Sequence, residues 1–526
     1  MPQPSITFNL GQGGLGQPAQ GQDYISGMQF YGTAPGTFVA NIPQAVFSLP
    51  DAVTKGITND YADETAATGT YLITTKGNTG DTIVAIITEA LPNGKTQTVN
   101  LGLYTVGSSD TTIALQGAAW AAIINAGTYS HGYSASFTTA TLTITARKGL
   151  GINLNSGTPL GITLTGAFAG TITQFSGGVY SKKILWYYQI AEIYRNYPQA
   201  KVWVMFTASP SILFTELQTL QAAANNGECR RIGVYSFTAR TAANVITDLG
   251  AMNTIGTTLF NNYMPCEFIY SPNIQTVSDL STLINLQNTT YPYASVCIGQ
   301  DGANVGTTAT PGGAQLYVNS GVSVGAVGAA VATKAKGAIS QNIGEVGAFN
   351  LSNGLELAVP AFTNGQLASA LTANLLNQLD GYRYIFLTTY TNFTGTYFNS
   401  DYTAAPQTSD YNSLARNEVI QKAVRGLYAG ILPLLKSRIN LNSDGTLTEV
   451  SMQQFKTNAS PTLIQMATAG DLSSGMVLNG KLAKGVITID PTQNVLSTNK
   501  IVIAIKLLPV GYANFITVNI GFVPTL

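Results

Sequence analysis

The sequence predicts a multidomain α/β protein with a central, mostly parallel α/β sheet core, an inserted β-rich domain, and an α+β C-terminal domain. It also predicts a strand-like arm at each end of the chain. Three observations lead to this fold class. Between residues 178 and 400, short apolar runs alternate with helical patterns, which is typical of βαβ units. Residues 54–177 instead contain Thr-rich alternating runs separated by turn signals. Both termini carry a short strand pattern.

Length and composition restrict the function classes. The chain of 526 residues exceeds a single hydrophobic core, which stops growing at about 250–300 residues. Only 10% of the residues are charged, and 25 Lys and Arg balance 25 Asp and Glu. A chain without net charge has no field that attracts nucleic acid or an anionic membrane, and it favours self-association. We therefore expect a homo-oligomer that makes no direct contact with nucleic acid.

The cysteines and the N-terminus indicate an intracellular setting. Cys229, Cys266 and Cys297 are odd in number and widely spaced, so we expect reduced, packed thiols. No basic and apolar leader is visible, so we expect folding in a cytoplasm. The most apolar segment, 321–332, is too short to cross a bilayer. We expect no membrane insertion, and a buried helix in this segment whose glycines admit a neighbouring backbone.

Residues 1–23 are expected to form an extended N-terminal arm and a hinge. Polar and apolar side chains alternate over residues 5–10, as in a strand. The glycine-rich stretch 11–16 literally matches the dinucleotide-binding pattern G-x-G-x-x-G. Neither a helix pattern nor an acidic residue for a ribose follows at the required distance. We therefore interpret the glycines as a flexible hinge.

The next two segments differ from each other in composition. Residues 24–53, with short strands expected at 27–31 and 37–42, begin the core domain. Residues 54–177 are rich in Thr, Gly and Asn, and one apolar helix at 116–124 interrupts their strand patterns. We interpret this second segment as an inserted, outward-facing β-rich domain.

Residues 178–400 are expected to complete the α/β core. Ligands of parallel sheets bind beyond the carboxyl ends of the strands. The loops expected there, 207–211 and 301–304, are polar but contain neither a Walker lysine nor a nucleophile elbow. The expected strands are 201–206, 231–237, 267–270, 293–298 and 384–388, and the expected helices are 182–193, 212–224, 242–249 and 277–286.

No catalytic, cofactor-binding or metal-binding residue is expected. His131 is the only histidine, which excludes a multi-histidine metal site and leaves no support for a Ser-His-Asp triad. The acidic cluster of Asp60, Asp63 and Glu64 lacks a glycine-turned oxygen cage and is interpreted as a solvated boundary. Residues 440–451 imitate the start of a calcium loop but place serine where the bidentate glutamate belongs. We expect a plain Asp-Gly turn there.

The C-terminal domain, residues 401–526, ends in strand patterns. Isoleucine alternates with other residues over 501–505, a Pro-Val-Gly corner follows, and β-formers resume at 515–522. Pro524 prevents this last strand from continuing as a central member of a sheet. Because a lone strand is marginal until a sheet accepts it, both termini suggest partners outside the subunit.

Two short motifs near the N-terminus and a longer series in the C-terminal half follow one another in a fixed order. They are Gly13-Gly14-Leu15-Gly16, Gly27-Met28-Gln29-Phe30-Tyr31-Gly32, Gly395-Thr396-Tyr397-Phe398-Asn399-Ser400-Asp401-Tyr402-Thr403, Ser409-Asp410-Tyr411, the helix 414–435 with Arg416, Glu418, Lys422, Ala423 and Arg425, Asp444-Gly445-Thr446, Leu508-Pro509-Val510-Gly511, and 516–521. This series resembles contractile phage tail sheath proteins, and the resemblance covers about residues 11–31 and 178–526.

The resemblance implies a structural subunit, not an enzyme, that needs no cofactor. Sheath subunits stack as hexameric rings around an inner tube and contract to drive the tube through a cell envelope. The implied partners are further copies of the chain, the inner tail tube protein, and baseplate and tail terminator proteins. The implied location is the tail of a virion, after assembly in the cytoplasm of a host bacterium.

The resemblance also implies which residues join the subunits. Terminal arms add strands to a neighbour's C-terminal sheet, which is expected here at 486–489 and 501–505. Arg416 and Arg425 are candidates for contacting the tube, because their helix concentrates charge in a charge-poor chain. On the same helix, Glu418 and Lys422 are spaced for an intrahelical pair. The arm residues are Ile6, Thr7, Phe8, Leu10, Ile516, Thr517, Val518, Asn519 and Ile520.

Three alternatives stay open at this point. The sheath of a phage-derived bacterial contractile injection system would have the same sequence features. An α/β hydrolase-like enzyme would need a concave pocket that holds a carboxylate with a perturbed pKa. A spike or adhesin, suggested by the Thr- and Gly-rich segment, would form trimers rather than helical polymers.

Overall fold

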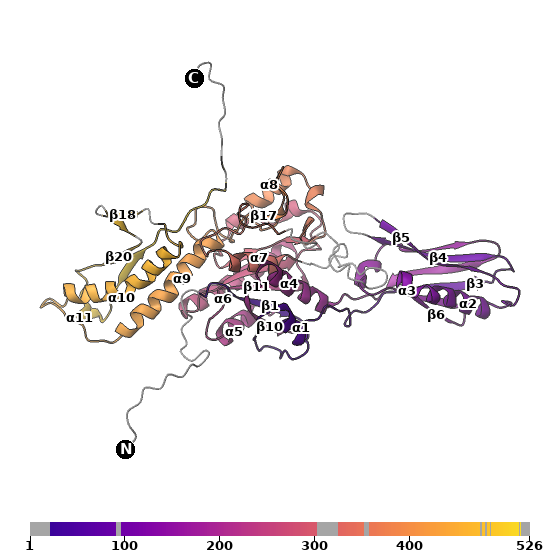
Figure 1. Cartoon of the computed structure of the whole chain (residues 1–526), viewed down its shortest axis with the longest axis horizontal. Coiled ribbons are helices and arrows are strands. Elements are labelled where there is room, and N and C mark those ends of the chain that lie inside the picture. The colour runs from indigo at the N-terminus through magenta and orange to yellow at the C-terminus, as the bar shows by residue number, and fades with distance from the viewer. Residues whose placement is uncertain are drawn as a thin grey trace, which may run out of the picture.

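The computed structural model describes residues 22–90, 96–301, 325–351, 357–473, 476–478, 481–483, 485–514 and 516. The molecule is elongated (Figure 1), with a sheet-based core between a β-rich part on one side and two long helices on the other. These helices are α9 (Leu414–Ile431) and α10 (Glu449–Thr468). The mixed α/β class predicted from the sequence is confirmed. The predicted domain boundaries remain predictions.

The core is built around one sheet of six strands. Five strands run parallel, and the edge strand β2 is antiparallel to β10. All residues of β1 are buried, because this early strand lies between β11 and β10 in the middle of the sheet. In spatial order the strands are β13 (Ala294–Val296), β12 (Glu267–Asn273), β11 (Arg231–Ala239), β1 (Ile25–Tyr31), β10 (Lys201–Thr207) and β2 (Gln44–Val46).

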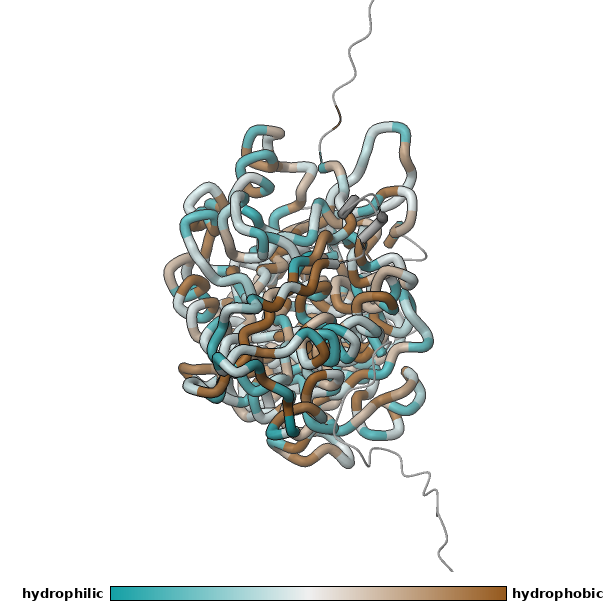
Figure 2. The backbone as a smooth tube through the Cα atoms, turned by 90° about the vertical axis from the view of Figure 1, so that its left-hand side faces the viewer, coloured by the Kyte–Doolittle hydropathy of each residue, from teal (hydrophilic) through white to brown (hydrophobic). Residues whose placement is uncertain are grey.

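Helices cover both faces of this sheet and form two separate hydrophobic clusters. Met28 and Phe30 of β1 belong to the cluster on one face, whereas Tyr31 belongs to the cluster on the other. Apolar segments accordingly run through the middle of the molecule in Figure 2. The first face is covered by α1 (Leu49–Thr54), α4 (Lys182–Asn196) and α7 (Val327–Lys336), and the second by α5 (Thr215–Ala223) and α6 (Ala242–Asn261).

The buried glycine-rich helix predicted at 321–332 corresponds in part to α7, and residues 302–324 lie outside the described residues. A Cβ atom added to Gly328 would lie 2.4 Å from the carbonyl oxygen of Gln189 in α4. The glycine therefore permits the close backbone approach that the sequence predicted.

Two predicted elements of the core are wrong. The strand expected at 37–42 is a turn in which Asn41 has a φ of 63°, and β2 follows it instead. The helix expected at 277–286 is two short 3-10 turns, Leu280–Thr282 and Leu286–Asn288. The side chains of Asp279 and Asn285 accept backbone hydrogen bonds and so favour isolated turns over a continuous helix.

Several short strands lie outside the main sheet. The predicted strand 384–388 is reduced to β16 (Leu387–Thr388), which pairs with β17 (Tyr397–Phe398). In the sequence between the last strand of the main sheet and α9, β14 (Gly299–Asp301) pairs with β15 (Pro360–Phe362), and α8 (Ala373–Gly381) follows β15.

The β-rich part contains two sheets around its own buried core, with strand orders β6-β7-β3-β9 and β5-β4-β8. The predicted helix is α2 (Ile113–Ala126), which buries Trp120 against the strands. A bridge between Thr65 and Val179 joins the entering and leaving chain. The remaining elements are β3 (Thr68–Thr75), β4 (Thr82–Ala90), β5 (Thr96–Thr105), α3 (Thr128–His131), β6 (Ser134–Thr138), β7 (Thr141–Thr145), β8 (Leu160–Leu164) and β9 (Ala169–Ser176).

The acidic cluster near this bridge lies at the boundary of the β-rich part, where Asp63 is exposed and Asp60 and Glu64 are half-buried. Asp63 accepts hydrogen bonds from Ser181 and from the backbone N–H of Lys182 at the start of α4. Glu64 accepts from the N–H of Gly149 at 3.0 Å. Asp63 therefore links the β-rich part to the core, whereas Glu64 bonds within the β-rich part.

The C-terminal part consists of packed helices and small sheets. α9 packs against α10, and a short antiparallel sheet of β20 (Val486–Ile489) and β21 (Ile503–Lys506) packs on α10. The other elements there are β18 (Met476–Leu478), β19 (Lys481–Ala483) and α11 (Val495–Thr498). Across the described ranges, no helix has the length and apolar character needed to cross a membrane.

Candidate assembly site

The sheet predicted to receive strands is present as the pair β20–β21. Val486 lies opposite Lys506 and Ile489 lies opposite Ile503. Ile489 is buried with Phe455 of α10, whereas Thr488 and Ala504 are exposed. Within the described residues, these two strands pair only with each other. A two-stranded sheet is marginal alone, so its free edges can accept further strands.

The chain that leaves β21 is anchored before it reaches the predicted C-terminal arm. Pro509 forms a bridge with Leu472, at the end of α10. The hydroxyl of Tyr512 then donates a hydrogen bond to the carboxylate of Asp401 at 3.0 Å. Beyond this anchor, Ile516 is 82% exposed. The arm thus begins at a defined position on the core.

The anchoring carboxylate is itself held from several sides. Asp401 is fully buried and accepts hydrogen bonds from the side chain of Asn342 and the N–H of Ala415, both at 2.9 Å. Burial raises the pKa of Asp401 above its usual range. The pKa of Tyr512 is also raised, first by burial and then by the charge of Asp401. Tyr512 therefore remains a neutral donor at physiological pH.

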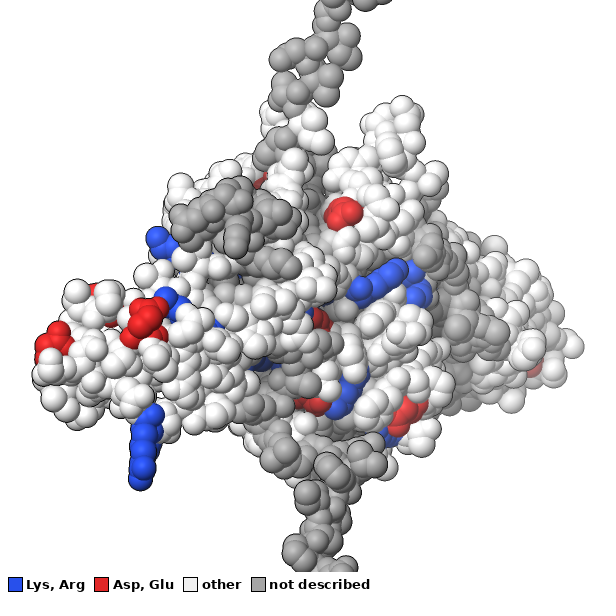
Figure 3. All heavy atoms as spheres, turned by 60° about the vertical axis from the view of Figure 1, so that its left-hand side comes forward, with Lys and Arg blue, Asp and Glu red and all other residues white. Residues whose placement is uncertain are grey.

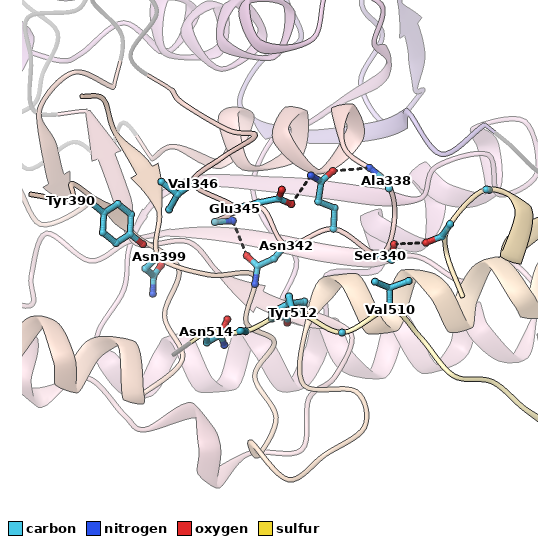
Figure 4. A pocket seen from close by; sticks show the side chains of 16 residues that line it. Ala338, Ser340, Asn342, Glu345, Val346, Tyr390, Asn399, Val510, Tyr512 and Asn514 are labelled. Carbon is cyan, nitrogen blue, oxygen red and sulfur yellow. Dashed lines mark hydrogen bonds between the residues drawn. The ribbon is translucent and has the colours of Figure 1, made fainter. Parts of the chain in front are cut away.

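A cleft of about 750 Å³ borders the anchored segment. Figure 4 shows Val510, Tyr512 and Asn514 along one wall and Asn342 and Glu345 along the other. Its polar groups are bonded locally, because Asn342 accepts from the N–H of Gly344 at 2.7 Å. The cleft is therefore a polar border of the arm's exit.

Most predicted arm residues cannot be placed. Ile6, Thr7, Phe8 and Leu10 lie outside the described residues, as do Thr517, Val518, Asn519 and Ile520. Ile516 is described and is not in a strand. The assignment of these residues to exchanging strands stays a prediction.

The two arginines proposed to contact the tube differ in their surroundings. Arg416, in the first turn of α9, is half-buried, and its Nη1 donates to Oδ1 of Asn412 at 3.1 Å. Arg425 is only 7% exposed and donates to the carbonyl of Pro265. Burial holds the pKa of Arg425 well below its usual range. Arg425 is thus covered by the core and is not available to a tube in this chain, which corrects the prediction for that residue.

The charges of α9 form a buried network with the core instead of the predicted intrahelical pair. Glu418 pairs with Arg231, the first residue of β11, at 2.6 Å. Lys422 pairs with both Asp23 and Asp471 at 2.7 Å. The spacing of Glu418 and Lys422 was compatible with a pair on one helix, but only the fold shows that other elements supply closer partners. This network attaches the C-terminal part to the N-terminal edge of the parallel strands.

The carboxyl edge of the sheet holds internal contacts. The hydroxyl of Ser211, in the loop after β10, donates to Glu216 at 2.6 Å.

The histidine and the cysteines also have structural surroundings. Nδ1 of His131, in the β-rich part, accepts from the N–H of Tyr133 and stabilises a turn. The three cysteines are free and buried, as predicted, and burial raises the pKa of Cys297 to about 12. No group of three or more His, Cys, Asp or Glu suited to a metal occurs in the described part of the chain.

Comparison with known proteins finds similarity in the C-terminal region and in the fold. A family model described as DUF2586, C-terminal domain, matches residues 410–526. No curated protein matches the chain. The sheath tail protein Lin1278 from Listeria innocua is 10% identical with a TM-score of 0.38, and the match covers 94% of this chain and 96% of that one.

Two further structures come from contractile systems. The anti-feeding prophage helical sheath in its contracted state is 11% identical with a TM-score of 0.43, covering 62% of this chain and 80% of that one. The contracted sheath complex of the extracellular contractile injection system PVC is 10% identical with a TM-score of 0.41, covering 64% and 79%.

Proposed function

We propose that this chain is the structural subunit of a contractile tail sheath, which polymerises as stacked hexameric rings around an inner tube. The observation that supports the proposal is the open β20–β21 sheet next to an anchored chain exit. In the described part of the chain, β20 and β21 pair only with each other, and one apolar face of their sheet packs on α10. The chain is anchored at Tyr512 shortly before the strand-forming sequence 515–522, and Ile516 is exposed.

Strand donation is the proposed link between subunits. The arms at residues 6–10 and 516–522 of neighbouring copies pair with β20 and β21. Backbone pairing suits a contracting assembly, because it keeps two subunits connected while side-chain contacts between them rearrange. Contacts between two different surfaces repeat from copy to copy and build a helical polymer.

The proposed contraction needs neither a catalytic site nor a nucleotide. The extended sheath is kinetically trapped and releases stored free energy when triggered. Its proposed partners are the inner tail tube protein, which Arg416 remains a candidate to contact, and the baseplate and tail terminator proteins. The proposed site of action is a virion tail that ejects a genome, after assembly in the host cytoplasm. A phage-derived bacterial injection system would use the same subunit, and adjacent capsid and packaging genes would distinguish the two.

Negative-stain electron microscopy of the purified full-length chain tests the proposal. A sheath subunit forms rings or tubes at raised concentration. A spike forms trimers, and an α/β enzyme forms small globular particles. Particles of the last two kinds at every concentration, ionic strength and pH tried would contradict a sheath.

A further inference from the structure

A small cavity of about 290 Å³ shares Tyr512 and Asn514 with the cleft described above. It is formed where the end of α8, the start of α9 and the exit of the C-terminal arm meet. Its lining includes Asp380, Arg383, Tyr402, Asn412 and Arg416. We call it the arginine pocket. Its volume suits one side chain better than a nucleotide or cofactor.

Two guanidinium groups converge in the arginine pocket on a single asparagine. Arg416 donates to the side-chain oxygen of Asn412 at 3.1 Å, and Nη2 of Arg383 donates to the backbone oxygen of the same residue. Arg383 also donates to the carbonyl of Thr403 at 3.2 Å and lies over the ring of Tyr402, 4.4 Å from its centroid. Both arginines are thus oriented by neutral groups.

Neither arginine forms an ion pair within the described residues. Arg383 is nevertheless only 5% exposed, and burial lowers its pKa, although the nearby charges of Asp401 and Asp380 favour its charged form. Asp380 lines the same cavity, but its oxygens accept from Asn399 and Tyr402. A buried charge normally has an ionic partner, because its desolvation is unfavourable otherwise.

Other cations of the chain show the usual pattern. Arg147 and Arg240 each have a carboxylate oxygen at 2.6 Å and 2.7 Å, respectively. Arg425 is buried as well, with the charge of Asp23 near it, and it lines neither the arginine pocket nor the adjoining cleft. The arginine pocket differs because it holds two arginines, one of which, Arg416, is only half-buried.

The same chain carries acidic groups that match this pocket. The formal net charge of the chain is zero. An arginine or lysine without a carboxylate partner is therefore balanced by an aspartate or glutamate without a cationic partner. Asp444, Glu449 and Asp490 are exposed and lie around the ends of α10 and β20. Figure 3 shows that charged side chains are few on this face and that acidic ones gather at the end of the molecule formed by the C-terminal helices.

We propose that the arginine pocket binds an acidic side chain from a second copy of this chain. The inference rests on the proposed function, because it requires an adjoining subunit. The pocket lies at the root of the donated arm, since Tyr512 and Asn514 line it. An arm of eight residues spans at most about 27 Å, so its pairing with the β20–β21 sheet brings the donor's pocket near the acidic groups beside that sheet. The planar guanidinium groups bind the incoming carboxylate through paired hydrogen bonds.

The pocket is tested by charge reversal at Arg416, which is half-buried and can be changed without opening the core. We expect Arg416→Glu to raise the critical concentration for polymerisation at least ~10-fold, as measured by light scattering and microscopy. Arg383→Met should act in the same direction, with its folding checked by circular dichroism. Arg438→Glu is the matched control, because Arg438 is an exposed arginine just after α9, and it should polymerise normally.

The occupant is tested on the acidic side. Among Asp444→Asn, Glu449→Gln and Asp490→Asn, at least one should weaken polymerisation similarly, and replacing that residue by lysine should restore polymerisation of Arg416→Glu. If wild type polymerises and Arg416→Glu polymerises at the same critical concentration, the pocket proposal is wrong while the sheath proposal stands. If Arg416→Glu fails but no acidic variant has any effect, a second copy is not the occupant. Failure of the wild type to polymerise would refute the sheath proposal itself.

Discussion

The hydroxyl of Tyr512 donates a hydrogen bond to the buried carboxylate of Asp401 at 3.0 Å, although 111 residues separate them in the chain. Asp401 also accepts from the N–H of Ala415 at the start of α9. One carboxylate therefore joins the exit of the C-terminal arm to the helix that is held to the core by the buried ionic network. A pull on the arm would be transmitted to α9.

Removing this hydrogen bond should loosen the exit without unfolding the subunit. We expect Tyr512→Phe to lower the free energy of unfolding by about 0.5–1.5 kcal/mol, because the buried carboxylate loses one of its donors. Urea denaturation of the monomer measures the change. Tyr263→Phe, at a more exposed tyrosine, is a suitable control and should be nearly neutral. An equal loss in both variants would show that the bond to Asp401 contributes nothing specific.

Donation of the C-terminal strand predicts a separation between folding and assembly. Deleting residues 514–526 should leave the melting temperature of the monomer nearly unchanged and abolish sheath formation, because the strand completes a neighbour's sheet. Deleting residues 1–10 should act likewise.

A point substitution tests strand donation without shortening the chain. Val518→Pro removes an amide donor and strains an extended strand, so it should prevent polymerisation. Val518→Thr retains the N–H and the strand propensity and serves as its control. Contractile tubes formed by the proline variant, or unfolding of its monomer, would refute donation by this arm.

The β-rich part should be dispensable for polymerisation. The bridge between Thr65 and Val179 and the contact of Asp63 with α4 lie at its base. Replacing residues 66–178 by a short Gly/Ser linker keeps both contacts, so we expect a folded subunit that still forms tubes, with a smaller outer diameter by electron microscopy. A folded variant that no longer polymerises would show that this part takes part in assembly.

Replacing only one member of the buried pair of Arg231 and Glu418 should strongly lower the free energy of unfolding. Both side chains are almost fully buried and lie 2.6 Å apart. We expect Arg231→Met to destabilise the subunit by about 3–5 kcal/mol, because the Glu418 charge stays buried without this partner. Lys55→Met removes a partly exposed pair with Asp51 and should cost only about 0–1 kcal/mol. Chemical denaturation of both variants measures the difference.

The same network predicts a pH dependence. Burial raises the pKa of Glu267 well above its ordinary value of 4.5, and the charge of Glu418 adds to this shift. The folded state therefore binds this proton more tightly than the unfolded chain does, and wild type loses stability as pH rises from about 4.5 toward the folded pKa. Glu267→Gln imitates the protonated form, so both proteins should have equal urea midpoints near pH 4. The variant should be the more stable one at pH 8, and coinciding midpoints at both values would contradict the shift.

Local patterns in the sequence were sufficient for most of the core and for the sheet of the assembly site. The strands predicted at 201–206 and 231–237 and the helix predicted at 182–193 are present as β10, β11 and α4. They followed from apolar periodicity, because the side chains that face a core recur with the period of their element. The strand β21 followed from the same alternation over 501–505, whereas β20 was expected at 486–489 from the family resemblance. The failures were short elements such as 277–286, where side chains that bond to their own backbone outweigh helical periodicity.

The sequence by itself determined a charge-poor α/β chain with strand-forming ends and no recognisable catalytic apparatus. Only the tertiary structure decided which partner each charge has. Arg425 belongs to the interior, Lys422 bonds to Asp23 and Asp471, and Arg383 and Arg416 converge on Asn412. Spacing along a helix defines which residues share a face, but the burial of that face depends on elements hundreds of residues away. Long-range packing therefore sets the ionic partners that no local pattern contains.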